Sequence, residues 1–307
     1  MALESQTEAI AAIQTLVESQ WTVLTDDTAE RKTFTLVNTL PFVKARAHSW
    51  PLNTTGITSA SFDLSTGVLA TAGEQITALA TMVIRGQHAR YSIAREALFQ
   101  TDGSPQYAVN LKTTRATQAV RDLLIGIEAG LWSDGTGNSN KDIVGMNLAV
   151  DSTGTYSGID RSTYTNFASV ETAHTTVWTA SQTDATLRTL RTSPKNTQPD
   201  VAATTPATWD QIWQTLKSNN PNQSVNTDTS FGGCSAIVYS GVPIVAAADC
   251  TSGHIYWLRL EDFHIGEVRG VEVTELGVTA DIIDAYVAWS GGLVCKHSGR
   301  QGKDVIS

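Results

Sequence analysis

The segment from Pro105 to Trp132 predicts a single long amphipathic helix, which constrains the fold of this 307-residue chain more than any other feature. Pro105 suits the first turn of a helix, where its missing N–H costs nothing. Apolar residues then share one face: Ala116, Ala119, Val120, Leu123, Leu124, Ile127, Leu131 and Trp132. Arg115, Gln118 and Asp122 lie on the other side. At 1.5 Å per residue the helix is roughly 40 Å long, and the polar run SDGTGN ends it.

Residues 56–95 have a different composition. They are rich in Thr, Ser, Val and Ile and are punctuated by Gly56, Gly67, Gly73 and Gly86. This pattern predicts two or three strands joined by turns. Large side chains are scarce, so the segment lacks the content for a core of its own. Because an isolated two-stranded ribbon is marginal in water, we expect this ribbon to lie on another surface.

The segment TTPATWDQIWQTL, residues 204–216, predicts a second helix. Thr205 can cap its N-terminus and Pro206 fits the first helical position. Trp209, Ile212, Trp213 and Leu216 follow at the spacing of one helical face. A carbohydrate or nucleic-acid base platform would need exposed rings flanked by polar groups. Because Ile212 and Leu216 share the face, we expect the two indoles to be buried in the core.

The remaining segments mix helix and strand, so the expected class is α+β. Apolar residues at helical spacing over 9–17 predict a short amphipathic helix in an N-terminal arm. The segment GTYSGIDRSTY, residues 154–164, predicts a turn-rich loop. Short strands are predicted at CSAIVYS, VPIVAAA and HIYWLRL, which are residues 234–240, 242–248 and 254–260. Residues 278–296 predict one long strand or a hairpin broken at Gly291–Gly292.

Composition narrows the classes of function. Hydrophobic residues make up 41% and charged residues 17%, and the formal net charge is -9, which argues against a surface built mainly to grip phosphates. No signal peptide and no membrane-spanning apolar run are expected. Cys234, Cys250 and Cys295 are odd in number and far apart, which indicates free, buried thiols in a reducing compartment.

Catalytic and ligand-binding motifs are missing from the sequence. The spacing of a nucleophile elbow, a phosphate loop or a dinucleotide loop does not occur. Cys250, His254, Cys295 and His297 could be drawn as a zinc tetrad, but their spacing is not a standard one. Asp134, Asn138 and Asp142 could be drawn as a calcium loop, but the bidentate Glu and the Gly register are missing. We therefore expect no catalytic, cofactor-binding or metal-binding residues and no enzymatic activity.

Five phrases in order give the sequence a specific resemblance. They are residues 128–150 (EAGLWSDGTGNSNKDIVGMNLAV), 154–164 (GTYSGIDRSTY), 201–216 (VAATTPATWDQIWQTL), 239–263 (YSGVPIVAAADCTSGHIYWLRLEDF) and 285–303 (AYVAWSGGLVCKHSGRQGK). Together they resemble the major capsid protein of tailed bacteriophages, with the Hong Kong ninety-seven-type capsid fold. The resemblance covers roughly residues 40–303. Asp249 and Cys250 stand at a turn where Thr251 replaces the family's usual Pro.

The resemblance implies a tailed-phage major capsid fold with five parts. Residues 1–50 would be the N-terminal arm, 51–100 the extended β-loop, 101–142 the peripheral domain with its long spine helix, and 143–265 the axial domain. Residues 266–307 would form the return strand of the peripheral domain and the C-terminal tail. The implied function is a structural protein that self-assembles into pentamers and hexamers of an icosahedral shell enclosing phage DNA.

The resemblance also implies partners and a location. Copies of the chain itself are the main partners. Separate scaffolding, decoration and portal proteins, and packaged double-stranded DNA bound without sequence specificity, are the others; no membrane partner is expected. The protein would lie in the virion capsid after assembly in the host cytoplasm. No lysine lies between Lys44 and Lys112, so the ribbon cannot supply the lysine of a covalent isopeptide mesh and we predict a non-covalent shell.

Contact residues and alternatives complete the prediction. Arg85 and Arg90 in the ribbon are predicted to face acidic partners on a neighbouring subunit, although both could be merely solvated. An encapsulin-type cellular nanocompartment is the alternative within the same fold. A cytosolic enzyme or carbohydrate-binding module that uses the Trp-rich region, and a tail or decoration protein of a virion, are the alternatives outside it.

Overall fold

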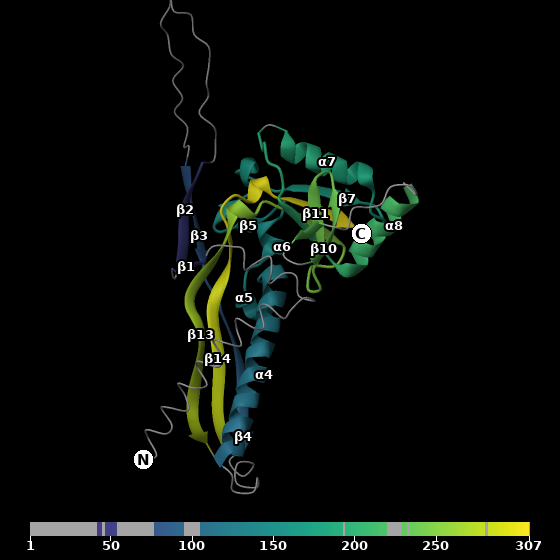
Figure 1. Cartoon of the computed structure of the whole chain (residues 1–307). Coiled ribbons are helices and arrows are strands. Elements are labelled where there is room, and N and C mark those ends of the chain that lie inside the picture. The colour runs from purple at the N-terminus through teal and green to yellow at the C-terminus, as the bar shows by residue number, and fades with distance from the viewer. Residues whose placement is uncertain are drawn as a thin grey trace, which may run out of the picture.

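The computed structural model describes residues 42–44, 47–53, 77–94, 105–192, 194–219, 229–231, 234–279 and 282–306. Its elements form two parts (Figure 1). One is a long part, in which a helix lies along a narrow sheet. The other is a compact part built on a wide sheet, at one end of the long part. The amphipathic helix predicted at 9–17 lies outside the described residues.

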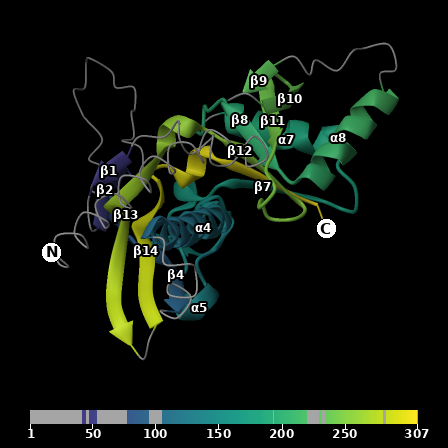
Figure 2. The same ribbon diagram turned by 60° about the horizontal axis from the view of Figure 1, so that its bottom comes forward.

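Helix α4 (Pro105–Trp132) confirms the predicted long helix at both bounds. All eight residues of the predicted apolar face are buried. They pack on strands β4 (Gly86–Ala94) and β14 (Ile282–Cys295). Burying each large apolar side chain stabilises the fold by about 1.5–3 kcal/mol, so this face fixes the helix along the sheet, as the end-on view in Figure 2 shows.

The narrow sheet has the strand order β1-β13-β14-β4. Strand β1 (Phe42–Lys44) is parallel to β13 (Phe263–Thr279), and the other pairs are antiparallel. Of the two alternatives predicted for 278–296, the long strand is confirmed and the hairpin is wrong, because β14 runs unbroken through Gly291 and Gly292 and pairs with β13. The reason lies in packing, because a Cβ at Gly291 would come within 2.1 Å of the Trp289 ring. The glycine thus makes room for an indole rather than for a turn.

The wide sheet has the strand order β7-β15-β12-β8-β11-β10-β9. Its strands are β7 (Val170–His174), β8 (Val201–Thr204), β9 (Thr229–Phe231), β10 (Cys234–Tyr239), β11 (Val242–Ala246), β12 (His254–Leu258) and β15 (Gly302–Ile306). Helices α7 (Ala180–Arg191) and α8 (Pro206–Asn219) pack against it around a core that includes Trp178 and Trp257. The three predicted short strands and the second predicted helix are confirmed within a few residues.

A separate two-stranded ribbon projects beside the hairpin (Figure 1). It pairs β2 (Ala47–Asn53) with β3 (Thr77–Val83). Short elements complete the described chain: α5 (Gly137–Asn140), α6 (Met146–Ala149), β5 (Thr155–Tyr156), β6 (Ile159–Asp160) and the 3-10 turns η1 (Thr165–Phe167), η2 (Leu260–Asp262) and η3 (Ser298–Arg300). The predicted turn-rich loop is the β5–β6 hairpin, whose two turn residues both have positive φ.

Strands β4 and β15 each join a sheet through partners distant in sequence. Strand β4 belonged to the predicted extended loop at 51–100, but it pairs with β14 and packs on α4, because every second side chain points toward the helix. Strand β15, which belongs to the predicted C-terminal tail within 266–307, lies between β7 and β12 in the wide sheet. Its buried Asp304 bonds to hydroxyls of α7, which draws the strand into the compact part.

Candidate assembly surfaces

One face of the β2–β3 ribbon is open and apolar. Pro51 lies opposite Leu79, and Leu79 is 67% exposed. The next pair on this face, Ser49 and Thr81, share a hydroxyl hydrogen bond of 3.1 Å. No charged residue occurs in either strand. A face of this kind, an apolar centre beside satisfied hydroxyls, suits contact with another protein surface.

The opposite face of the ribbon is anchored on its own chain. His48, Trp50, Leu52, Ala80 and Met82 are buried there. The Trp50 indole N–H donates to the carbonyl of Lys296 at 3.0 Å, and the Thr81 amide donates to the carbonyl of Ser157 at 2.9 Å. Of the ribbon predicted at 56–95, the structure describes residues 77–94, and its strand β3 pairs with β2 and lies on the chain's own core.

Further exposed apolar residues gather on the narrow sheet. Among the described residues, the other large apolar side chains exposed there are Val43, Val268, Leu276 and Ile282. An open groove of about 530 Å³ lies over the face of this sheet, lined by Leu276, Tyr286 and Ala288 and also by polar side chains that include Arg90 and Arg269. Large exposed apolar residues are therefore concentrated in the ribbon and the narrow sheet, and few lie on the compact part.

Arg85 and Arg90 make contacts within their own chain. The Arg85 guanidinium donates to the carbonyls of Gly135 and Asp142 at 2.8 and 2.6 Å, which ties the turn after α4 to the start of β4. Arg90 pairs with Asp284 at 2.6 Å, and its side chain is 60% exposed. The predicted contact of both residues with a neighbouring subunit stays a prediction. Arg85 has in addition an internal role that the sequence analysis missed, because backbone carbonyls leave no signal in the sequence.

The segment drawn as a calcium loop is a polar turn. Asn138, Ser139 and Asn140 all have positive φ, which gives a short left-handed turn. The Asp134 carboxylate accepts from the amide and the hydroxyl of Thr136. These hydrogen bonds favour the ionised form and lower the pKa of Asp134. Within the described ranges, no group of three or more His, Cys, Asp or Glu side chains is placed to hold a metal ion.

The cysteines of the zinc alternative are core residues. Cys250 and Cys295 are buried and free. Burial raises the pKa of both thiols, so each stays protonated and is a poor metal ligand. His254 stacks on Tyr256 with ring centroids 5.8 Å apart. The expectation of buried free thiols is confirmed for these two cysteines.

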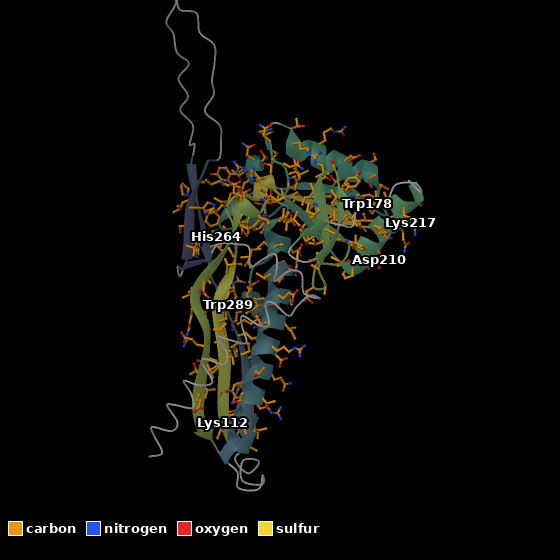
Figure 3. The ribbon with its side chains drawn as sticks, in the orientation of Figure 1. Lys112, Trp178, Asp210, Lys217, His264 and Trp289 are labelled. Carbon is orange, nitrogen blue, oxygen red and sulfur yellow. The ribbon has the colours of Figure 1, made fainter. Side chains whose placement is uncertain are left out.

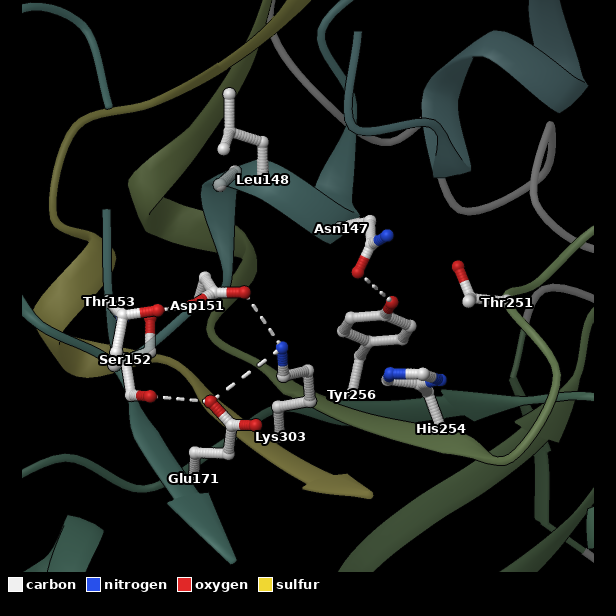
Figure 4. A network of polar contacts seen from close by, with 12 residues as sticks. Asn147, Leu148, Asp151, Ser152, Thr153, Glu171, Thr251, His254, Tyr256 and Lys303 are labelled. Carbon is white, nitrogen blue, oxygen red and sulfur yellow. Dashed lines mark hydrogen bonds and ion pairs between the residues drawn. The ribbon is translucent and has the colours of Figure 1, made fainter. Parts of the chain in front are cut away.

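Lys303 is the centre of a polar network on one face of the wide sheet (Figure 4). It is buried, and its Nζ lies 3.0 Å from Asp151 Oδ2 and 3.7 Å from Glu171 Oε2. Ser152 donates its hydroxyl to Glu171. Partial burial acts to raise the pKa of Asp151, but hydrogen bonds from Thr153 and Lys303 outweigh it, and the pKa is lowered. The network joins the loop after α6 to the C-terminal strand.

Asp304 is the centre of a second network on the other side of β15. Its carboxylate is fully buried and accepts from the hydroxyls of Thr183 and Thr186 and from the Trp257 indole N–H. His174 Nε2 lies 3.5 Å from the same carboxylate. Although hydroxyl, imidazole and carboxylate meet here, all are enclosed by the core. The arrangement holds α7 on the sheet and offers no surface to a substrate.

The Trp209–Trp213 pair departs from the prediction of burial. Both indoles are half-buried and stack almost parallel, with centroids 6.0 Å apart and planes 5° apart. The Trp209 N–H donates to the carbonyl of Ile244 at 3.1 Å. The face that enters the core is carried by Ile212, which is fully buried. Periodicity identified the correct face of α8 but could not show that its indoles lie at the rim of the core.

Comparisons with known proteins show which solved structures have a similar fold. No family model matches the sequence, and no curated protein matches it. The capsid asymmetric unit of cyanophage A-1(L) is similar in structure, with a TM-score of 0.72 and 18% identity over 89% of this chain and 91% of that chain. A structure of Mycobacterium phage Patience has a TM-score of 0.59 and 14% identity over 97% and 88%. The holo-SrpI encapsulin complex of Synechococcus elongatus PCC 7942 has a TM-score of 0.53 and 12% identity over 88% and 86%.

The fold is shared by a cyanophage capsid and an encapsulin. It is the tailed-phage major capsid fold, as the sequence predicted. Among the residues that the structure describes, no helix combines the length and apolar character needed to cross a bilayer.

Proposed function

We propose that this chain is the structural major capsid protein of a tailed bacteriophage. It would assemble into pentamers and hexamers of an icosahedral shell around phage DNA. The observation that carries the proposal is the capsid fold over most of the chain together with the open apolar face of the ribbon. An exposed Leu79 side chain does not stabilise a monomer. If a neighbouring copy buries this side chain, the burial stabilises the assembly by about 1.5–3 kcal/mol per site.

The parts of the fold would divide the work of assembly. The compact part would be the axial domain that meets its copies at the five- and six-fold axes. The α4 layer would be the peripheral domain. The ribbon would contact the adjacent subunit, and Arg90, which is exposed, would add a polar contact that sets register. The absence of lysine between Lys44 and Lys112 supports a non-covalent shell.

Location and further partners follow from the same role. The protein would form the virion capsid after assembly in the host cytoplasm. Scaffolding, decoration and portal proteins would be separate chains. Packaged double-stranded DNA would be held without sequence-specific contacts, which suits a chain of net charge -9, because a strongly basic lining would obstruct packaging.

An encapsulin-type compartment is the second candidate, because an encapsulin complex shares the fold. The two functions differ in what the shell encloses. Particles that enclose a specific co-purified protein instead of nucleic acid would favour the compartment.

The test is electron microscopy with sedimentation of the full-length recombinant protein and of Leu79→Asp. We expect closed shells or capsomers for the unchanged protein. The free energy of unfolding of Leu79→Asp should lie within about 0.5 kcal/mol of that of the unchanged protein, as is usual for substitutions of exposed residues. The variant should nevertheless form few or no shells. The matched control is Ile125→Asp, which charges a 36% exposed apolar residue of α4, where the proposal places no contact between copies, and should assemble normally. Normal shells from Leu79→Asp would contradict the assigned role of the ribbon.

A further inference from the structure

Two buried histidines join the ribbon to the hairpin. His48 lies on β2 and His264 on β13, and they are 7% and 3% exposed. His264 Nε2 and His48 Nδ1 are 3.1 Å apart, so the rings share one hydrogen bond. Their centroids are 5.0 Å apart. Gly266 leaves the space for this contact, because a Cβ there would come within 2.7 Å of His48 Nε2.

The surroundings of the two rings favour their neutral forms. The outward ring nitrogens, His48 Nε2 and His264 Nδ1, are buried without a hydrogen-bond partner among the described residues. Burial lowers the pKa of His264 to about 4, and Lys296 and His48 add to this effect. Burial and Lys296 also lower the pKa of His48, while the nearby carbonyl of Val43 acts in the opposite direction.

Among the described residues, no carboxylate contributes to the pKa shift of either ring. The described ribbon strands contain no acidic or basic residue. The acidic side chain nearest to His264 in sequence is Asp262, which accepts from the Gln301 amide and pairs with Arg300. On β13 the nearest is Glu267, which accepts from the Trp289 indole at 3.1 Å. From the β5–β6 hairpin, Tyr156 donates to the sulfur of Met82. The charged group whose field acts on both rings is Lys296, a cation.

We propose that the His48–His264 pair is an acid-sensitive latch, which holds the base of the ribbon on the hairpin and releases it when both rings are protonated. The pair can accept one added proton, because the N–H of the protonated ring still donates to the facing nitrogen of the neutral ring. Two protons place two N–H donors and two positive charges face to face in a buried site. The pair then repels, and the ribbon face that carries Trp50, Leu52 and Met82 separates from the core.

This regulation rests on the proposed function, because release of the ribbon matters where its open face is an assembly surface. Acid would then change the angle at which the ribbon meets a neighbouring copy. The histidines thus control a contact in which they take no direct part.

The test is amide hydrogen exchange by mass spectrometry on full-length subunits kept below the concentration at which they assemble. Exchange is corrected for its intrinsic pH dependence and followed from pH 7 to pH 3.5. We expect peptides that cover 47–53 and 77–83 to lose protection at least tenfold, with a midpoint near pH 4, while α8 and β12 stay protected. The double variant His48→Leu/His264→Leu should keep its ribbon protected throughout, and the exposed-residue control His88→Gln should behave like the unchanged protein.

Two results would overturn the latch. One is a ribbon that stays protected to pH 3.5 in the unchanged protein. The other is loss of protection at the same pH in the double variant. If the double variant does not fold, His264→Asn takes its place, and its ribbon midpoint must move by at least half a pH unit for the proposal to stand. Because subunits are measured before assembly, failure here leaves the capsid proposal untouched, and failure to form shells leaves the latch untouched.

Discussion

Lys303 and Asp304 are neighbours in β15 that point to opposite faces of the wide sheet. Lys303 bridges Asp151 and Glu171 near the surface, and Asp304 gathers two threonine hydroxyls and an indole N–H inside the core. Buried charge is costly unless it is paired or hydrogen-bonded. The C-terminal strand is therefore held in place by two polar networks as well as by apolar packing.

Replacing Lys303 by Met should cost about 1–3 kcal/mol of unfolding free energy at pH 7, because Asp151 and Glu171 then face each other without a cation. Urea denaturation measures this. The control is Arg269→Met, which removes an exposed ion pair with Glu272 and should cost less than about 1 kcal/mol. A cost for Lys303→Met no larger than that of the control would contradict the role of the network.

The same variant should show a defined pH dependence. The folded-state pKa of Asp151 is depressed, so its contribution to stability is present above its unfolded pKa of about 3.9 and is lost as pH falls through the folded value. The stability gap between the unchanged protein and Lys303→Met should therefore narrow between pH 5 and pH 3. A gap that stays constant over this range would show that Lys303 does not act through Asp151.

At the scale of elements, α4 and the β13–β14 hairpin form the stiff axis of the long part. Leu123 is 1% exposed at the centre of the helix face that packs on this sheet. Leu123→Ala should lower the free energy of unfolding by about 2–5 kcal/mol, because it removes packed atoms and leaves a cavity. Chemical denaturation checks this, with the exposed Gln118→Ala in the same helix as control. If the two substitutions lowered the free energy of unfolding equally, packing of the apolar face of α4 would not stabilise the core.

The sequence predicted some elements well for physical reasons that can be named. Helix α4 was predicted at both bounds because Pro105, an unbroken apolar period and a polar stop all agree. Strand β13 was missed because three register shifts against β14 interrupt its alternation, and because Val268 and Leu276 place apolar side chains in solvent. The sequence left a long strand and a hairpin open at Gly291, because a glycine that makes room for the Trp289 ring has the same sequence signal as a turn glycine.

The candidate surfaces were less predictable than the fold. A need for support under the ribbon could be inferred from its composition, but the open Pro51–Leu79 pair depends on strand register, which the sequence does not fix. Arg85 binds backbone carbonyls and Lys303 lies between two carboxylates distant in sequence. Such contacts arise only when the chain has folded.

At the scale of the whole molecule, the described chain divides into an elongated layer and a compact part (Figure 3). The wide sheet carries satisfied internal networks, so it suits a rigid block. The ribbon and the narrow sheet carry most of the exposed large apolar residues of the described chain. This division is expected of a subunit that fixes its shape internally and leaves apolar area for its neighbours to cover.

Electron cryomicroscopy of particles assembled from the full-length recombinant chain tests the central claim most directly. The predicted result is a closed icosahedral shell of pentamers and hexamers in which the Pro51–Leu79 face of each ribbon contacts an adjacent copy. Particles whose ribbon faces remain in solvent, or a chain that stays monomeric at every concentration and with crowding agents, would contradict it.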